Sequence, residues 1–326
     1  MRLLILGGTA FLSRQTARQA VARGHQVTCA ARGSAPTADG VELVRVDRDS
    51  SLDALAGREF DAVIDVARRP SHVRRALDEL SDRVGHWIFV STVSVYADDL
   101  AIGRRVENSP LLAPLPADGD ETLPGNYGHN KVSCENLVTR RWGSAALVVR
   151  AGLIVGPDDP SNRFPYWVSR IARGGEVLAP GDPADLVQCV DVRDLASWLV
   201  DGAEKRLGGT YDSDSPPMTR ADFLDGVRKG VGADATFTWV PQEFLVDHQV
   251  EEWMGPRSLP LWVKLPENAG FMSRDVTAVV AAGHEFRDIS DSAAATLAWL
   301  RAENPTLTPA GLTAEEEAKL LAAWRG

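Results

Sequence analysis

Two groups of residues could carry out acid–base chemistry on a carbonyl or an alcohol. Ser91 and Thr92 end an apolar run, and Tyr127 stands four positions before Lys131. Side chains four apart lie on one face of a helix, so the Lys131 ammonium can stand close to the Tyr127 phenol. A nearby ammonium lowers the pKa of a tyrosine from its usual value of about 10. Tyr127 is therefore a candidate general acid or base, Lys131 its activator, and Thr92 a hydroxyl that holds the substrate oxygen.

The Tyr-x-x-x-Lys spacing is a weak signal by itself, because it arises by chance in many proteins. A surface tyrosine beside a solvated lysine is the plain alternative. The context strengthens the signal: Tyr127 comes about 35 residues after the hydroxyl-bearing end of an apolar run, and the chain begins with a candidate dinucleotide-binding unit. The context therefore favours a catalytic pair.

The N-terminal segment has the pattern of that unit. Residues 2–6 form an apolar run typical of a buried parallel strand, Gly7 and Gly8 interrupt it, and residues 13–23 carry an apolar stripe at helical spacing. A second apolar strand follows at 26–30. Unpaired N–H groups at a helix start stabilise a pyrophosphate when no side chain blocks its approach, so this order within roughly 30 residues indicates dinucleotide binding. A glycine turn that merely connects strand to helix is the alternative.

Length and composition exclude several function classes. The 326 residues are 44% apolar and 25% charged, which is typical of a soluble globular protein. The net charge of −10 argues against a nucleic-acid or membrane partner, and no apolar run is long enough to span a bilayer. Cys29, Cys134 and Cys189 form no pair motif, and the histidines show no metal-ligand spacing. We therefore expect a cytoplasmic monomer or homodimer without a metal ion.

Apolar strands and amphipathic helices alternate along the first half of the chain. Further strands are expected at 41–46, 61–66, 87–90 and 146–150, and helices at 51–56, 71–80 and 130–141. Residues 98–125 are rich in proline and glycine and are predicted to form a loop over the site, or else a plain surface loop. The alternation predicts an α/β fold with a Rossmann-type doubly wound parallel sheet, in which ligands bind beyond the carboxyl ends of the strands.

The second half of the chain is predicted to form a smaller domain with some segments returning to the sheet. Helices are expected at 163–173, 192–200, 219–227 and after Thr313, and strands at 187–190 and 236–240. Residues 1–160, joined by 187–215, are assigned to the dinucleotide-binding domain. Residues 161–186 and 216–326 are assigned to a substrate-binding domain.

These motifs resemble those of the extended and atypical short-chain dehydrogenases/reductases, the NAD(P)-dependent epimerase/dehydratase-like family. The resemblance covers roughly residues 1–215 and rests on GGTAFL, STVSVYA, YGHNK, VVRAGLIVGP and VQCVDVRDLA. It implies catalytic roles for Thr92, Tyr127 and Lys131, of which Lys131 would also bind the nicotinamide ribose. It also implies that the nicotinamide lies against the backbone at Ala151–Ile154.

The sequence departs from the family pattern in two motifs. The GxxGxxG positions are Gly7, Ala10 and Ser13, and Ala97 stands where a glycine often follows the Val-Tyr pair. These departures bring the chain close to atypical members, some of which have lost catalysis. Because the hydroxyl, tyrosine and lysine are all present, we expect that this chain has kept it.

The end of the second strand indicates which nicotinamide cofactor is bound. An NAD-preferring site carries an acidic residue there, whereas this chain has Arg32, which can pair with a 2′-phosphate. Arg14 offers a second contact, so NADP is favoured, although NAD is possible and both arginines could simply be solvated. Asp47 is placed to bind the adenine amine. The expected cofactor-binding residues are Gly7, Thr9, Ala10, Phe11, Leu12, Arg14, Arg32, Asp47, Ala67, Arg68, Tyr127, Lys131, Ala151 and Leu153.

The substrate pocket is assigned from position along the chain alone. The expected substrate-binding residues are Ser94, Arg163, Tyr166, Trp167 and Gln188. Trp253 and Trp262 are candidates for closing the pocket, and core packing explains such aromatic residues equally well. Arg163, Arg170 and Arg173 could bind a diphosphate, but arginines on one helix more often form a solvated face.

We therefore predict an NADP-dependent oxidoreductase that transfers a hydride between nicotinamide and a carbonyl or alcohol of a small organic substrate. A nucleotide-sugar epimerase or dehydratase with tightly bound NAD is the first alternative. A catalytically idle cofactor sensor or RNA-associated protein on the same fold is the second. The small-molecule substrate is the expected partner.

Overall fold

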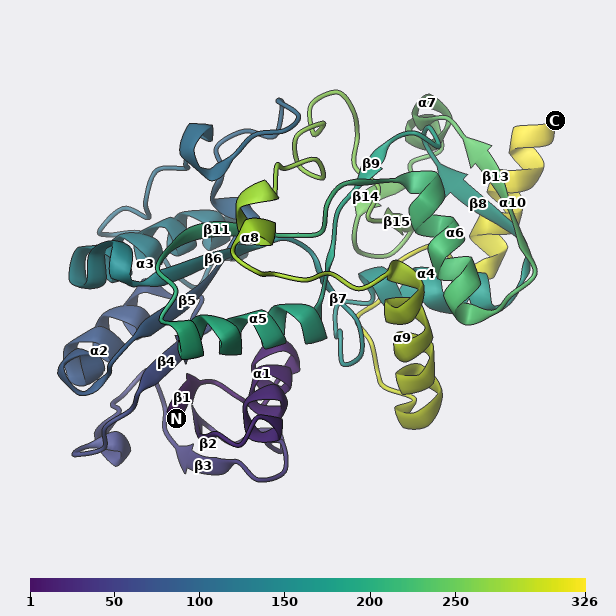
Figure 1. Ribbon diagram of the computed structural model, residues 1–326. Coiled ribbons are helices and arrows are strands. Elements are labelled where there is room, and N and C mark those ends of the chain that lie inside the picture. Colours follow the sequence, from purple (N-terminus) through teal and green to yellow (C-terminus); the bar gives the residue numbers. More distant parts are fainter.

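A parallel sheet of seven strands forms the centre of the larger of two lobes in the computed structural model, which describes residues 1–326 (Figure 1). The strands are β1 (Arg2–Leu6), β2 (Gln26–Ala31), β3 (Glu42–Arg45), β4 (Ala62–Asp65), β5 (Trp87–Thr92), β6 (Leu147–Ala151) and β11 (Gly209–Ser213). Their order is β11-β6-β5-β4-β1-β2-β3, and all neighbouring pairs are parallel. The order reverses between β1 and β4, so the predicted doubly wound fold is confirmed, and a ligand crevice is expected beyond the strand ends there.

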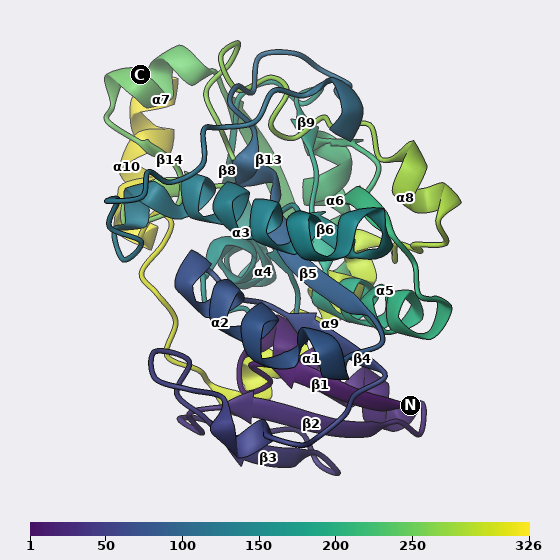
Figure 2. The same cartoon turned by 90° about the vertical axis from the view of Figure 1, so that its left-hand side faces the viewer.

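Helices cover both faces of this sheet, because its strands are apolar on both sides (Figure 2). Leu3 and Ile5 share a core with side chains of α1 (Phe11–Ala22) and α5 (Val192–Lys205). Their neighbours Leu4 and Leu6 share the opposite core with α2 (Pro70–Leu80) and α3 (Tyr127–Trp142). The short helix α8 (Thr277–Ala281) adds Val279 to the first of these cores, so a late segment also packs against the sheet.

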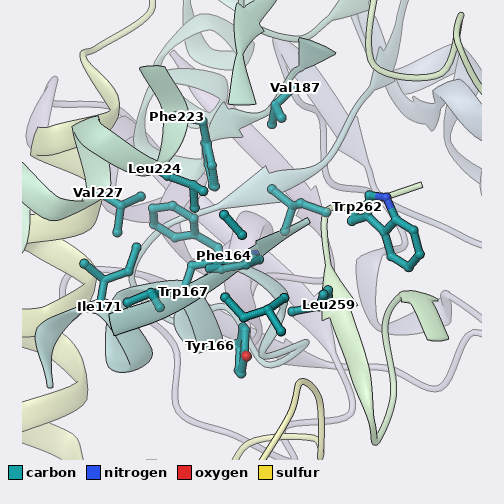
Figure 3. Close-up of a cluster of buried hydrophobic side chains, with 14 of the residues drawn as sticks. Phe164, Tyr166, Trp167, Ile171, Val187, Phe223, Leu224, Val227, Leu259 and Trp262 are labelled. Atoms are coloured by element: carbon teal, nitrogen blue, oxygen red, sulfur yellow. The ribbon is translucent and has the colours of Figure 1, made fainter. Parts of the chain in front are cut away.

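The smaller lobe packs around the helix α4 (Arg163–Ala172). Its other helices are α6 (Arg220–Val231), α7 (Gln242–Asp247), α9 (Ile289–Glu303) and α10 (Ala314–Arg325). Its core comprises 29 buried residues, among which Phe164 of α4 meets Phe223 of α6 with ring centroids 6.1 Å apart (Figure 3). The Trp167 indole donates to the Pro260 carbonyl at 2.6 Å, which satisfies its polar atom inside this core.

Paired short strands complete the smaller lobe and its connection to the sheet. The pairs are β8 (Gly175–Pro180) with β13 (Ala235–Val240), β9 (Leu186–Val187) with β12 (Met218–Thr219), β14 (Glu251–Trp253) with β15 (Ser258–Pro260), and β7 (Ile154–Val155) with β10 (Val190–Asp191). No helix of the structure combines the length and the apolar character that a membrane crossing requires.

Most expected elements are present with boundaries shifted by a few residues, but two predictions were wrong. The helix expected at 51–56 is only a 3₁₀ turn at Asp53–Leu55, because Gly57 follows with a left-handed φ of 72°. The strand expected at 187–190 is divided into β9 and β10, each of which pairs with a different partner. The helix expected from residue 130 begins at Tyr127, which makes this tyrosine its first residue.

Candidate active site

Two hollows adjoin at the carboxyl ends of the strands and share Val66 and Arg68 in their walls. The inner hollow has a volume of about 700 Å³ and is lined by Thr92, Tyr127 and Lys131 among others. The outer hollow has a volume of about 370 Å³ and lies by the turn after β1 and the ends of β2 and β3. Together they form one crevice at the place where the strand order reverses, which is where doubly wound sheets bind nucleotides.

The glycine turn after β1 lies close against β2 at the crevice. Gly7 and Gly8 have φ values of 134° and 101°, which side-chain-bearing residues rarely adopt. A Cβ placed on Gly8 would lie 2.1 Å from the sulfur of Cys29 on β2. Gly8 is therefore required by packing as well as by backbone conformation.

We expect Gly8→Ala to destabilise the fold by about 2–4 kcal/mol, because it adds a steric clash to backbone strain. Gly24→Ala is the matched control, since Gly24 also has a positive φ of 80° but a Cβ there would meet nothing within 4 Å. Denaturation of the two variants beside the wild type measures the difference. Equal losses of stability in Gly8→Ala and Gly24→Ala would show that contact with Cys29 does not exclude a side chain at position 8.

The start of α1 faces the inner hollow through Ala10, Phe11, Leu12 and Ser13. The Arg14 N–H donates to the Ala10 carbonyl at 3.1 Å, which leaves the preceding N–H groups of α1 without helical partners. The first turn of α1 contains no acidic side chain. The buried Ser13 hydroxyl donates to the Ala10 carbonyl at 2.8 Å, so its polar group is satisfied within the turn. These donors at the crevice fit the pyrophosphate of a dinucleotide despite the two departures from the glycine pattern.

The structure brings the three expected acid–base residues to one wall of the inner hollow. Thr92 ends β5, Tyr127 opens α3, and Lys131 follows one turn later. Gly128 allows this approach, since a Cβ there would lie 2.4 Å from the Ser94 carbonyl oxygen. The Thr92 hydroxyl accepts from the Ser94 N–H at 3.2 Å, which fixes the turn after β5.

Lys131 is 3% exposed and is held by backbone carbonyl groups. Its Nζ donates to Ala67 at 2.7 Å and to Val90 at 2.6 Å, and it lies 4.8 Å from the centroid of the Phe89 ring. An ammonium has three N–H donors, so one remains for a ligand. The Tyr127 hydroxyl has no hydrogen-bond partner within the protein, so it too can serve a ligand.

A buried polar network supports the end of β5 behind this part of the inner hollow. The Arg150 guanidinium of β6 binds Glu135 of α3 in a two-pronged pair of 3.0 and 2.7 Å, and Glu135 also accepts from the Ser91 hydroxyl. Arg150 donates to the Tyr96 hydroxyl at 3.1 Å, and Tyr96 donates to Asp212. Burial raises the pKa of Tyr96, which therefore stays a neutral donor in this network.

Of the expected substrate residues, Ser94 and Arg163 line the inner hollow. The Arg163 guanidinium lies 4.8 Å from the ring centroid of Trp253, forms no ion pair, and donates to the Ser161 hydroxyl at 3.2 Å. Burial lowers the pKa of Arg163. Trp253, the candidate for closing the pocket, lines the hollow as well.

The other expected substrate residues lie elsewhere. Tyr166 and Trp167 pack against each other in the core of the smaller lobe, with ring centroids 5.2 Å apart, and Trp262 is buried in the same core. The Gln188 side chain is fully buried and bonds the Ser215 carbonyl at 2.8 Å and the Arg274 N–H at 2.7 Å. These side chains hold segments together and do not line either hollow.

Several residues of the inner hollow were not expected from the sequence. Phe271 and Met272 come from a segment far along the chain, and Asp159 and Asp214 are carboxyl groups with exposures of 1% and 2%. The two acids follow β7 and β11, so an acidic residue just after a strand end is the signal that could have identified them. No three His, Cys, Asp or Glu side chains are arranged to hold a metal ion.

The outer hollow contains the expected adenosine-side residues. Arg32, Asp47, Ala67 and Arg68 line it, together with Gly7 and Thr9. Arg32 and Arg68 are exposed and form no ion pair, whereas the nearby Arg48 is bound to Asp65 at 2.7 Å. Arg14 lines neither hollow and pairs with Asp158 at 2.8 Å. The cationic groups left for a ligand at this end are thus Arg32 and Arg68.

Comparison with known proteins agrees with this architecture. Residues 77–211 match the model of the NAD dependent epimerase/dehydratase family. The chloroplast stem-loop binding protein of 41 kDa b from Arabidopsis thaliana is 25% identical over 227 residues, which cover 63% of this chain and 56% of that protein. The 2′-dehydrokanamycin reductase of Streptomyces kanamyceticus is 24% identical over 267 residues, which cover 77% and 72% of the two chains.

A solved structure shows the same fold. The Bordetella bronchiseptica enzyme WbmH, determined in complex with NAD⁺, has a TM-score of 0.66 and 15% identity, with coverage of 93% of this chain and 99% of that chain. Residues 77–211 thus have the sequence pattern of the NAD dependent epimerase/dehydratase family, and the whole chain has the fold of this solved structure, in agreement with the resemblance seen in its motifs. Its cofactor is accordingly NAD(P).

Proposed function

We propose that this protein is an NADP-dependent oxidoreductase acting on the carbonyl or alcohol group of a small organic substrate. The observation that carries the proposal is the meeting of Thr92, Tyr127 and Lys131 on one wall of a hollow that continues past the start of α1. When bound, the nicotinamide supplies or accepts the hydride. The expected dinucleotide-binding residues at the turn after β1 fit the phosphates of that cofactor.

The side chains of the chain itself supply the proton chemistry. Tyr127 donates a proton to the substrate oxygen in reduction and accepts it in oxidation, and Lys131 stands one helical turn after it on α3. The hydroxyl groups of Thr92 and Ser94 orient that oxygen. Trp253, together with the apolar side chains nearby, excludes water from the reacting groups.

The preference for NADP rests on the unpaired cations of the outer hollow. Arg32 and Arg68 form no ion pair, and no acidic side chain ends β2, where it would repel a 2′-phosphate. A guanidinium binds phosphate in a charge-assisted, two-pronged geometry. These features support NADP over NAD.

We expect Arg32→Ala to weaken NADPH binding by about tenfold to a hundredfold, because hydrogen bonds to charged groups contribute about 1.5–3 kcal/mol. NADH binding should change little, since NADH lacks the 2′-phosphate. Titration by nicotinamide fluorescence measures both constants. Arg141→Ala, which removes an exposed cation of α3 outside both hollows, is the control, and equal weakening of NADPH and NADH by Arg32→Ala would contradict the assignment.

The cations of the inner hollow favour a reductase over a nucleotide-sugar epimerase. A sugar diphosphate needs several cationic partners, and of the three arginines considered for this role only Arg163 lines the hollow. Arg170 is buried and bound to Glu317 of α10. Assay of the supernatant from heat-denatured protein distinguishes the two: an empty protein that binds NADPH selectively and oxidises it with a carbonyl compound supports the reductase, whereas co-purified NAD supports the epimerase.

The idle or RNA-associated alternative has one relative in its favour, the stem-loop binding protein. The net charge of −10 and the complete set of Thr92, Tyr127 and Lys131 weigh against it. If the protein binds neither NADPH nor NADH, the idle or RNA-associated alternative is favoured over the oxidoreductase.

A further inference from the structure

Asp214 is a buried carboxyl group that takes no part in the proton chemistry described above. It follows β11, is 2% exposed, and lines the inner hollow. It accepts one hydrogen bond, from the Ser215 N–H at 3.2 Å, and no cationic side chain forms an ion pair with it. A carboxyl group in such a place lacks a partner for its charged form.

Gly152, which directly follows β6, leaves room for this carboxyl group. A Cβ on Gly152 would lie 1.8 Å from Oδ2 of Asp214, so any other residue at position 152 would displace it. Gly152 belongs to the backbone stretch Ala151–Ile154, which lines the inner hollow and against which the resemblance implies that the nicotinamide lies. Asp214 therefore stands against the wall that is expected to hold the reacting ring.

The charged and titratable groups facing Asp214 come from three segments. Asp212 lies two residues before it on β11, Arg274 comes from the segment preceding α8, and the Cys189 thiol lies between β9 and β10. Arg274 is already bound to Asp212 at 2.6 Å. Burial raises the pKa of Asp214, and the negative charge of Asp212 raises it further. The hydrogen bond from the Ser215 N–H and the positive charge of Arg274 lower this pKa in part. The carboxyl group thus has no counter-charge of its own.

We propose that Asp214 is an electrostatic partner of the oxidised cofactor, with its carboxylate as the counter-charge to the nicotinamide ring. This inference rests on the proposed function. The oxidised ring is a cation and the reduced ring is neutral, so the carboxylate stabilises the oxidised form alone. Asp214 is thereby a positioning and redox-discriminating residue that favours reduction of the carbonyl substrate, because that direction creates the positive charge.

The expected result for Asp214→Asn is a loss of about tenfold in NADP⁺ affinity at a pH above the raised pKa, with less than a twofold change for NADPH. The magnitude follows from an opposite charge at close range, which shifts a carboxyl pKa by about one unit or more. NADPH affinity is read from nicotinamide fluorescence and NADP⁺ affinity from its competition. Glu315→Gln removes an exposed carboxylate of α10 outside both hollows and should leave the ratio of the two constants unchanged.

Proton release on the wild-type protein tests the same inference without a variant. Well below the raised pKa Asp214 stays neutral in both complexes and does not discriminate, and well above it the carboxylate favours NADP⁺ without proton release. The proton count is made at a pH between these limits. Binding of NADP⁺ lowers that pKa and must release a proton, whereas binding of NADPH does not. Calorimetry in two buffers of different ionisation enthalpy measures the number of protons released on binding of NADP⁺ and of NADPH. Equal proton counts, or an unchanged affinity ratio in Asp214→Asn, would overturn the inference alone, whereas failure of the wild type to bind either nucleotide would overturn the proposed function with it.

Discussion

Tyr127→Phe lowers the turnover of a carbonyl substrate by about 10²–10⁴-fold and leaves NADPH affinity nearly intact. Loss of a positioned general acid accounts for a rate effect of about this size. The hydroxyl has no partner within the protein, so its removal breaks no internal hydrogen bond and the fold should be unchanged. Steady-state oxidation of NADPH gives the turnover, and fluorescence titration gives the affinity.

Tyr166→Phe is the matched control for this prediction. Tyr166 loses the same hydroxyl, but it is buried in the core of the smaller lobe and lines neither hollow. Turnover of this variant should stay close to that of the wild type. Wild-type turnover in Tyr127→Phe would exclude Tyr127 as the proton donor, and a comparable loss in Tyr166→Phe would show that the effect is not local.

Glu135→Ala destabilises the protein by about 3–5 kcal/mol, the size expected when one partner of a buried ion pair is removed. The side chains of Glu135 and Arg150 are only 8% and 7% exposed, so the variant leaves a buried guanidinium without a carboxylate. It also frees the Ser91 hydroxyl, which is bound to Glu135 beside Thr92. Urea denaturation of the full chain, followed by fluorescence, measures the loss.

A surface pair provides the comparison for this stability effect. Glu315 and Lys319 on α10 form an ion pair with exposures of 78% and 74%, so Glu315→Ala should leave the stability nearly unchanged. A loss of less than about 1 kcal/mol in Glu135→Ala would mean that the buried network rearranges readily around Arg150.

The order of strands and helices in the larger lobe could be predicted from local patterns. A buried parallel strand needs apolar residues on both faces, so β1 is visible as an unbroken apolar run. The turn at Gly7-Gly8 and the start of α1 are visible in adjacent residues, although the contact of Gly8 with Cys29 on β2 is not. The position of Tyr127 one helical turn before Lys131 is equally local, and it could be predicted before the approach of α3 to β5 was known.

The substrate side could not be predicted in the same way. Tyr166 and Trp167 are of types common in pockets, yet they fill the core of the smaller lobe. The sequence does not distinguish a buried aromatic residue that faces a core from one that faces a cavity. Arg14 was expected at the cofactor and instead pairs with Asp158, a partner separated from it by most of the larger lobe's sequence.

The sequence by itself determined the fold class, the dinucleotide turn and the tyrosine–lysine pair, since each depends on periodicity or spacing within one or two adjacent elements. Only the tertiary structure decided which distant side chains complete the hollow. Asp214 reaches it because β11 returns to the sheet beside β6 and Gly152 leaves room for its carboxyl group. Trp253 and Phe271 reach it because the segment after β13 folds back over the strand ends. Such contacts depend on the packing of remote segments, and no local pattern of residue types encodes them.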